Sequence, residues 1–256
     1  MGQAKRRRAS FLLSHPVCIF CEGQSLATTE DHQPARSLFD RKEWPEGYVF
    51  PACETCNQAS KHDEQILALL VRINSEREDD PQRRLDFQKY VRAMNNNFPA
   101  VLKILTANQK RQFFKSERMR LPSGTALADL HMAGIRASDA NRAFGRVLRK
   151  IIRALHWKHT GQIAPIDDRM IALQWYTNAY LHILEEEGGW DIFIQLPSQP
   201  QIKRTGHDLS DQFSYRYGVN EARDVSAFLL AFRHSVIATG LVWQTEAAFR
   251  EWTAAA

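Results

Sequence analysis

Cys18-Ile19-Phe20-Cys21 and Cys53-Glu54-Thr55-Cys56 contain all four cysteines of this 256-residue chain, in two tight pairs within its first quarter. Secreted disulfide scaffolds spread their cysteines along the chain, and a redox C-x-x-C motif stands singly beside a βαβ unit, which this sequence lacks. Two C-x-x-C turns separated by a loop have the spacing by which four thiolates hold one tetrahedral metal ion. The sequence therefore predicts a structural zinc site made of Cys18, Cys21, Cys53 and Cys56, with no position open for catalysis.

The loop between the cysteine pairs contains the dipeptide Asp31-His32, and Asn57 follows the last cysteine directly. On an extended segment neighbouring side chains point to opposite faces, so one of the two can bind a metal ion while the other faces water or substrate. The zinc ties Cys56 to the first pair and can thereby bring Asn57 back towards this segment. Carboxylate and amide oxygens suit Mg²⁺ or Mn²⁺, and a neutral imidazole near such an ion can take a proton from water.

Residues 18–64 resemble the HNH endonuclease family in its ββα-metal form with an embedded four-cysteine zinc site. The resemblance depends on the two cysteine pairs, on Asp31-His32 with Pro34 shortly after it, and on Asn57. It implies that His32 is the general base, that Asp31 and Asn57 hold a catalytic Mg²⁺ or Mn²⁺, and that the reaction is hydrolysis of a DNA phosphodiester bond. In several family members a second histidine stands at the position of Asn57.

One stretch departs from the family pattern. The family often has an asparagine a few residues before the second cysteine pair, and this asparagine steadies the loop that carries the base. Residues 46–52 read Glu-Gly-Tyr-Val-Phe-Pro-Ala and contain no asparagine. Another part of the chain must therefore hold this loop, or the activity is weak.

Further polar residues complete the neighbourhood of this motif. Arg36 is a candidate ligand for a substrate phosphate, because a guanidinium group matches phosphate geometry. His62 lies about 140° around a helix from Asn57, whereas Glu64 returns to the face of Asn57 and is the better candidate for supporting the site. The alternative is that Asp31 merely caps a turn and His32 is an ordinary surface histidine, in a zinc module without catalytic activity.

Apolar residues at helical spacing predict helices through the middle of the chain. Pro81 suits the first turn of one helix, and the run of asparagines at 95–97 is its stop. The helix over 137–159 carries many basic side chains, which form either a solvated face or a track for nucleic acid. The predicted helices cover residues 63–74, 81–97, 98–119, 137–159 and 167–187, with a linker at 121–124.

After Gly188-Gly189 the apolar residues alternate with a period of two, which predicts strands of a small antiparallel sheet. These strands cover residues 190–196, 212–219, 225–232 and 236–243. The sequence thus predicts an α+β fold, with a ββα-metal HNH module at residues 1–75 and a helical and β domain of unassigned role at residues 76–256. Nothing in the second half translates into chemistry.

The composition favours a soluble, cytoplasmic protein with a polyanionic partner. Hydrophobic residues make up 44% and charged residues 25%, and the formal net charge is +5. Residues 4–8, Ala-Lys-Arg-Arg-Arg, form a basic arm that is either a nucleic-acid contact or a solvated charge run. The expected partner is DNA; the alternatives are a zinc module that binds nucleic acid without cleaving it, and a nuclease that acts on RNA.

Overall fold

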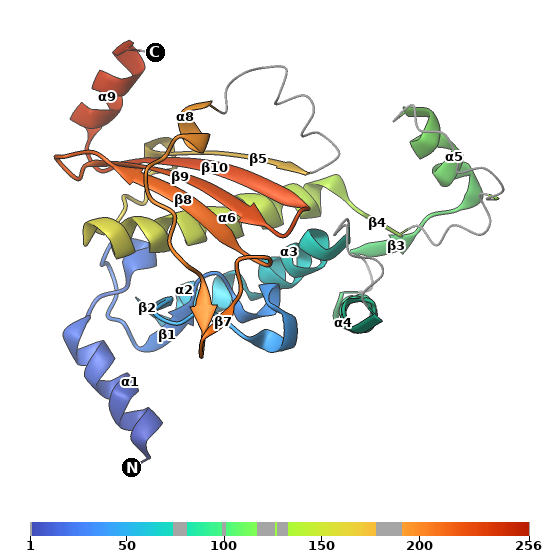
Figure 1. Ribbon diagram of the computed structural model, residues 1–256, viewed down its shortest axis with the longest axis horizontal. Coiled ribbons are helices and arrows are strands. Elements are labelled where there is room, and N and C mark those ends of the chain that lie inside the picture. The colour runs from blue at the N-terminus through green and yellow to red at the C-terminus, as the bar shows by residue number, and fades with distance from the viewer. Residues whose placement is uncertain are drawn as a thin grey trace.

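The computed structural model describes residues 2–73, 81–98, 101–116, 126, 133–177 and 191–255. Within these residues the protein combines helices with antiparallel strands, which confirms the predicted α+β class. Figure 1 shows three layers, with the largest sheet on one side, helix α6 in the middle and the N-terminal elements on the other side. The N-terminal helix α1 and the C-terminal helix α9 project from the same end of the molecule.

The N-terminal layer contains a short hairpin followed directly by two helices. Strand β1 pairs antiparallel with β2, with His32 opposite Val49 and Thr29 opposite Ala52. Helix α2 begins after Cys53, whose sulfur accepts a hydrogen bond from the Cys56 amide. The elements of this layer are α1 (Gln3–Ser14), the 3-10 turn η1 (Ile19–Cys21), β1 (Thr29–His32), the 3-10 turns η2 (Arg36–Leu38) and η3 (Asp40–Lys42), β2 (Val49–Ala52), α2 (Glu54–Ala59) and α3 (Lys61–Ile73).

Helix α6 (Ala137–Thr160) is the central element of the fold. Its apolar residues recur every three or four positions, and Val147, Ile151 and Leu155 are among those fully buried. The helix packs against α3 and η1 on one side and against strands of the main sheet on the other. It ends at Gly161, whose φ of 78° is the left-handed conformation that glycine adopts without strain.

The main sheet has the strand order β5-β10-β9-β8, and all its pairs are antiparallel. Buried and half-buried residues alternate along β9, as expected for a strand with one face against the core. The predicted strands 225–232 and 236–243 match β9 and β10, and the strand predicted at 212–219 is observed as β8. The strands are β5 (Ile171–Thr177), β8 (Ser214–Val219), β9 (Val225–Phe232) and β10 (Val236–Trp243).

Smaller elements surround these layers. The helices predicted at 63–74, 81–97 and 137–159 are confirmed as α3, α4 and α6. The linker predicted at 121–124 lies outside the described residues. The remaining elements are α4 (Pro81–Asn97), β3 (Leu102–Ile104), α5 (Ala107–Ser116), β4 (Ala133–Ile135), the 3-10 turn η4 (Asp168–Met170), α8 (Asp191–Ile194), β6 (Lys203–Arg204), β7 (His207–Asp208) and α9 (Glu246–Ala255).

The helix predicted over residues 98–119 is wrong in its first part. Residues 102–104 form β3 and pair with β4, and the helix α5 begins only at Ala107. Thr106 accepts a hydrogen bond from the Gln109 amide, and Gln109 Oε1 accepts one from the Thr106 amide. This reciprocal pair is a capping box, so the start of α5 was encoded locally by Thr106 and Gln109.

Two further predictions around residue 180 are wrong in the described part of the chain. The helix expected from residue 167 is a single 3-10 turn, after which residues 171–177 form the edge strand β5 along β10. The strand expected at 190–196 contains the short helix α8 instead. The spacing of apolar residues in this segment favours a helix. Pairing with β10, together with the aromatic and β-branched side chains of β5, favours the strand more strongly. Residues 178–190 lie outside the described residues.

One buried apolar cluster joins both halves of the chain. It contains Phe50 and Leu67 from the N-terminal layer, Ile151 from α6, and Phe213 and Phe228 from the sheet. The division into residues 1–75 and 76–256 stays a prediction, but the described halves share this core. No helix of the described residues is both long and apolar enough to cross a membrane.

Candidate metal centre and the histidine cluster

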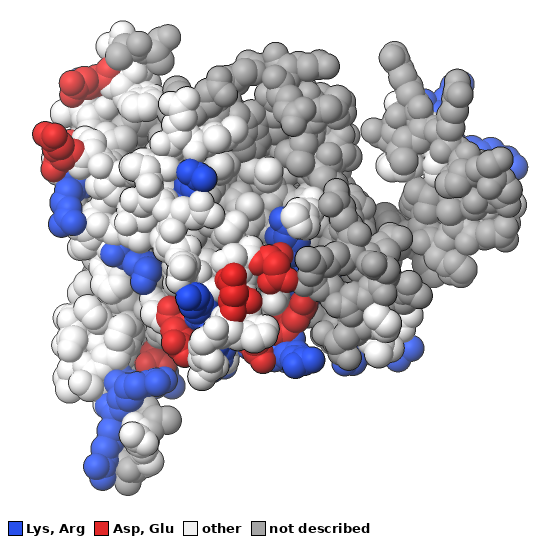
Figure 2. All heavy atoms as spheres, in the orientation of Figure 1, with Lys and Arg blue, Asp and Glu red and all other residues white. Residues whose placement is uncertain are grey.

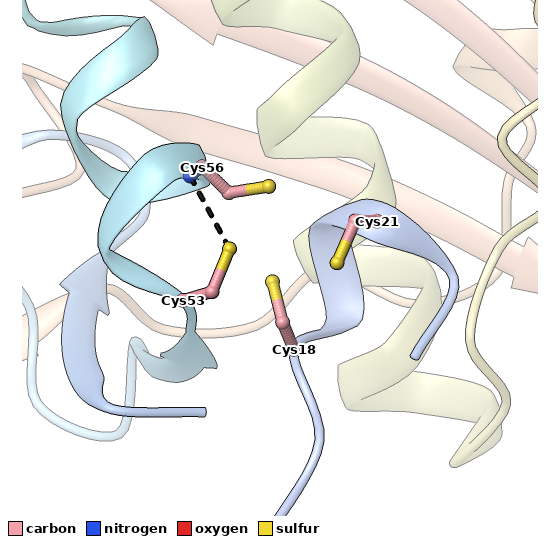
Figure 3. Close-up of side chains that lie close together, drawn as sticks. All are labelled: Cys18, Cys21, Cys53 and Cys56. Carbon is pink, nitrogen blue, oxygen red and sulfur yellow. Dashed lines mark hydrogen bonds between the residues drawn. The ribbon is translucent and has the colours of Figure 1, made fainter. Parts of the chain in front are cut away.

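The two cysteine pairs come together on facing turns. Figure 3 shows Cys18 and Cys21 on the η1 segment and Cys53 and Cys56 at the start of α2, with their sulfurs pointing towards one another. The four Sγ atoms all lie within 4.8 Å of one another. The turn after η1 uses the left-handed residues Glu22 and Gly23, which lets the chain reverse directly after Cys21.

This arrangement fits a tetrahedral metal ion. Burial raises the pKa of the Cys18 thiol, and burial together with the neighbouring thiols raises that of Cys56, so four thiolates are unfavourable here without a cation. An ion bonded to all four sulfurs would remove this repulsion and would release the thiol protons. The predicted clustering of Cys18, Cys21, Cys53 and Cys56 is therefore confirmed, and the cluster is compatible with a metal site such as zinc.

The two side chains of the Asp31-His32 dipeptide point to opposite faces of β1. Burial alternates along the strand, with Thr29 and Asp31 buried and Glu30 and His32 half-buried. The inner face looks towards α2, α3 and α6, whereas the outer face carries His32. Two separate environments result, and they impose different chemistry on the two residues.

On the inner face, Asp31 is bound by groups of the protein itself. Lys150 Nζ lies 2.6 Å from Asp31 Oδ2, and Gln33 Nε2 donates to Asp31 Oδ1 at 3.0 Å. Asp31 is only 5% exposed, and its burial raises its pKa, an effect that the nearby Lys150 opposes. Both carboxylate oxygens are thus engaged.

Asn57 also has partners within the hairpin. Its Nδ2 donates to Thr29 Oγ1 at 2.9 Å and to the Glu30 carbonyl at 3.3 Å, which fastens α2 to β1. The turn that carries Cys53 and Cys56 lies beside β1 and brings Asn57 to the Asp31 strand. As these side chains lie, however, Asp31 and Asn57 do not fit a divalent ion, because the carboxylate already binds an ammonium group and has no open side.

On the outer face, His32 belongs to a cluster of cationic and aromatic side chains, the histidine cluster, which also contains Arg36, Trp44 and Arg204. Arg36 Nη2 donates to His32 Nε2 at 2.7 Å, which places the imidazole proton on Nδ1. The His32 ring lies perpendicular to the Trp44 ring, with ring centroids 4.8 Å apart. Burial, followed by the charges of Arg36, Arg204 and Arg7, lowers the His32 pKa to about 4. The imidazole is therefore neutral at physiological pH.

Trp44 organises the two arginines nearest to His32. The guanidinium carbons of Arg36 and Arg204 lie 3.6 Å and 3.7 Å from the centre of its ring. Both guanidinium groups are thus close enough for cation–π attraction to the indole. The three residues come from η2, from the loop before β2 and from β6.

The loop that lacks the family's asparagine is held by the second half of the chain. The hairpin β6–β7 contacts it through Glu46, whose amide donates to the Lys203 carbonyl at 3.0 Å and whose Oε1 accepts from the Thr205 amide at 2.9 Å. Arg204 Nη1 donates to the Trp44 carbonyl at 3.0 Å, and Lys158 Nζ donates to the Gly47 carbonyl at 2.9 Å. The hairpin and α6 thus support this loop.

Most basic side chains of α6 have partners within the protein. Arg142 and Arg146 contact the buried Asp63, and Arg149 and Arg153 contact Asp168. Arg146 is nevertheless 63% exposed, so the alternative of a track for nucleic acid along α6 stays a prediction. Of the other residues near the motif, His62 lies tilted against Phe98 with ring centroids 4.0 Å apart, and Glu64 joins the group around Lys150.

Trp44, Lys150 and Arg204 belong to the site but were not predicted from the sequence. A signal for Arg204 exists in Thr205-Gly206, a two-residue turn with φ values of 47° and 80° that closes the hairpin β6–β7. Nothing in the local sequence separates Lys150 from the exposed cations of its helix. Comparison with protein-family models, with curated proteins and with solved structures gives no match for this chain.

Proposed function

We propose that this protein is an HNH-type endonuclease that hydrolyses DNA phosphodiester bonds at the outer face of β1. The observation that carries the proposal is the neutral imidazole of His32 among the guanidinium groups of Arg36, Arg204 and Arg7. A neutral base beside several fixed cations is the combination that phosphodiester hydrolysis needs, because the base activates water and the cations bind the phosphate.

His32 is the general base in this proposal. Its Nε2 lone pair accepts a hydrogen bond from Arg36 in the absence of substrate. A phosphate group near Arg36 competes for the same guanidinium donors, and charge-assisted bonds to phosphate are stronger than bonds to a neutral imidazole. Substrate binding therefore draws Arg36 away from His32, and the negative charge of the phosphate raises the His32 pKa towards the working pH.

The reaction then proceeds as an in-line hydrolysis. His32 Nε2 takes a proton from water while the water oxygen forms a bond to phosphorus. The bond from phosphorus to the 3′ oxygen breaks, and the departing oxygen takes a proton from the solvent. Arg36 and Arg204 stabilise the charge that develops on the phosphate oxygens.

The surface beside the cluster suits a polyanion. Helix α1 carries Lys5, Arg6, Arg7 and Arg8, and Figure 2 shows its basic side chains gathered on the projecting end of the molecule. Arg8 donates to the Thr28 carbonyl at 3.1 Å, which anchors α1 next to β1. Basic side chains of this kind supply affinity for the nucleic-acid backbone without sequence preference.

The test is nicking of supercoiled plasmid by zinc-loaded protein, with and without added Mg²⁺ or Mn²⁺. His32→Ala should keep its zinc, its fold and its DNA binding while cleavage falls by about a hundredfold or more, the usual contribution of a general base. His234→Ala is the matched control, because His234 is an exposed histidine in the turn between β9 and β10 and has no role in the proposed chemistry.

The outcomes separate the alternatives. DNA binding without cleavage by the parent protein would favour the zinc module that only binds nucleic acid. Cleavage of an RNA oligonucleotide but not of its 2′-deoxy counterpart would favour the RNA nuclease. Equal cleavage by the parent and His32→Ala would contradict the proposal.

A further inference from the structure

Lys150 lies in a buried pocket of oxygen atoms behind the histidine cluster. Its Nζ is 2.6 Å from Asp31 Oδ2, 2.6 Å from Ser60 Oγ and 3.5 Å from Glu64 Oε1. Ser60 Oγ in turn donates to Glu64 Oε1 at 2.6 Å. Two carboxylates and a hydroxyl group thus surround one ammonium group contributed by α6.

The pocket has the ligands of a divalent-ion site but no space for the ion's water. Hard oxygen donors of this kind suit Mg²⁺ and Mn²⁺, yet Mg²⁺ in proteins usually keeps several of its water molecules. Asp31 is 5% exposed, Ser60 is 4% exposed and Lys150 is 7% exposed. The space that coordinating water would need is filled by protein atoms.

The ammonium group also has no simple way out of the pocket. Lys150 sits on the face of α6 that packs between η1 and α3, and its Nζ lies 5.2 Å from the centre of the Phe20 ring. Removing this charge from the pocket would leave the buried Asp31 carboxylate and the half-buried Glu64 carboxylate close together without a cation, which is unfavourable. The position beside Asp31 therefore already has its cation.

We infer that Lys150 is the resident cation of the Asp31 pocket, and that it excludes Mg²⁺ and Mn²⁺ from the position where the HNH resemblance expects a catalytic ion. Lys150 is then a positioning residue, which holds β1, and with it His32, against α2, α3 and α6. The exclusion of the ion is inferred from the geometry of the pocket and does not depend on the proposed function. Its consequence, cleavage without a divalent ion at Asp31, depends on the proposed nuclease function.

The inference predicts that shortening Lys150 creates a metal site. Lys150→Ala removes the ammonium group and opens space beside Asp31, Ser60 and Glu64, so Mn²⁺ and its water molecules gain entry. Lys150→Met removes the same charge but keeps the space filled with apolar atoms. The two variants therefore separate the effect of charge from the effect of space.

The experiment is titration of zinc-loaded, full-length protein with Mn²⁺, in which electron paramagnetic resonance measures the free ion. Parent protein, its Asp31→Asn variant and Lys150→Met should bind Mn²⁺ equally weakly. Lys150→Ala should bind one Mn²⁺ per chain at least about tenfold more tightly, within the range by which groups around a metal site alter affinity. The Lys150→Ala/Asp31→Asn double variant should lose this site.

The Mn²⁺ titration of the parent protein tests the inference even if Lys150→Ala fails to fold. A parent site for one Mn²⁺ that disappears in Asp31→Asn would overturn the inference, and equally weak binding by these two proteins would support it. Plasmid cleavage provides the second measurement, because the parent rate should stay within about twofold when Mg²⁺ is added, well below the effect of losing a catalytic ion. If no plasmid is cleaved under any condition, the proposed function fails while the Mn²⁺ titration still decides the exclusion.

Discussion

At the scale of single residues, the two members of the Asp31-His32 dipeptide illustrate how one strand separates two kinds of chemistry. Asp31 faces inwards and is neutralised by Lys150, whereas His32 faces outwards among three arginines. The alternation of side chains along β1 is the cause, since it assigns neighbouring residues to opposite faces. The dipeptide therefore joins a structural ion pair to a candidate catalytic base.

Replacement of Arg36 tests the electrostatic coupling within the histidine cluster. Burial is the main cause of the low His32 pKa, and the Arg36 charge is the largest of the charge effects. Arg36→Ala should therefore raise the His32 pKa above its parent value of about 4 and weaken DNA binding. An NMR titration of the His32 ring signals measures the shift, with Arg250→Ala on the exposed face of α9 as control. An unchanged His32 pKa in Arg36→Ala would contradict the electrostatic coupling between these two residues.

A second histidine makes the free energy of unfolding depend on pH. His156 is fully buried between Ser226 and Gln244, and burial lowers its pKa from 6.5 to about 4. The unfolded chain thus takes up a proton below pH 6.5 that the folded chain does not, so stability is full above pH 6.5 and is lost as the pH falls towards 4. For His156 alone the full loss is ~3 kcal/mol.

Urea unfolding between pH 7 and pH 4.5 measures this effect. The free energy of unfolding of the parent should fall with pH, and His156→Gln should fall less steeply. Gly240→Ala serves as control, because it lowers stability without removing a titrating group. Equal slopes for the parent and His156→Gln would show that His156 makes no such contribution.

At the scale of secondary-structure elements, the contact between α6 and β10 depends on a glycine. A Cβ atom added at Gly240 would clash with Ile152 Cδ1 and would lie 2.9 Å from Ile152 Cγ1. Ile152 is fully buried, so it has little space into which to move. Gly240 is therefore the position where the sheet and its covering helix approach each other most closely among the described glycines.

Two glycine substitutions should have opposite effects on stability. Gly240→Ala should destabilise the fold by about 1–3 kcal/mol, because it overpacks this contact. Gly145→Ala, within α6, should stabilise it by up to about 1 kcal/mol, since nothing lies within 4 Å of the added Cβ and alanine favours the helix. Thermal and urea unfolding compare both variants with the parent. A Gly240→Ala variant as stable as the parent would contradict the close packing.

At the scale of the whole molecule, the N-terminal layer and the sheet depend on each other. They share the buried cluster around α6, and Arg233, in the turn between β9 and β10, is buried with its Nη2 2.6 Å from Asp40 Oδ1. Loss of order in one layer therefore exposes apolar surface of the other. Loss of the cysteine cluster should therefore affect the main sheet as well as the turns that carry the cysteines.

Removal of the metal should consequently affect the entire protein. Purified protein should contain about one zinc per chain, and Cys53→Ser should lose the metal and much of its solubility, because metal binding is coupled to folding. Chelation should lower the melting temperature of both layers together, as followed by circular dichroism and tryptophan fluorescence. Sheet unfolding that is unaffected by chelation would show two independent units, in agreement with the predicted division at residue 75.

Features that are encoded locally could be predicted from the amino-acid sequence. The spacing of the cysteines predicted their cluster, the period of two predicted β9 and β10, and the apolar stripe of residues 137–159 predicted α6. Each of these signals lies within one segment or in two copies of one motif. The capping box at Thr106 and the turn at Thr205-Gly206 were equally local, and they were missed.

The contacts between distant polar groups became visible in the folded protein. Lys150 lies far from Asp31 in the sequence and looks like any other cation of a basic helix, yet packing of α6 places it in the one pocket that binds the carboxylate. Arg204 likewise reaches His32 and Trp44 only because the hairpin β6–β7 docks on their loop. The physical reason is that ion pairing and burial depend on distances across the fold, and a single sequence does not contain those distances.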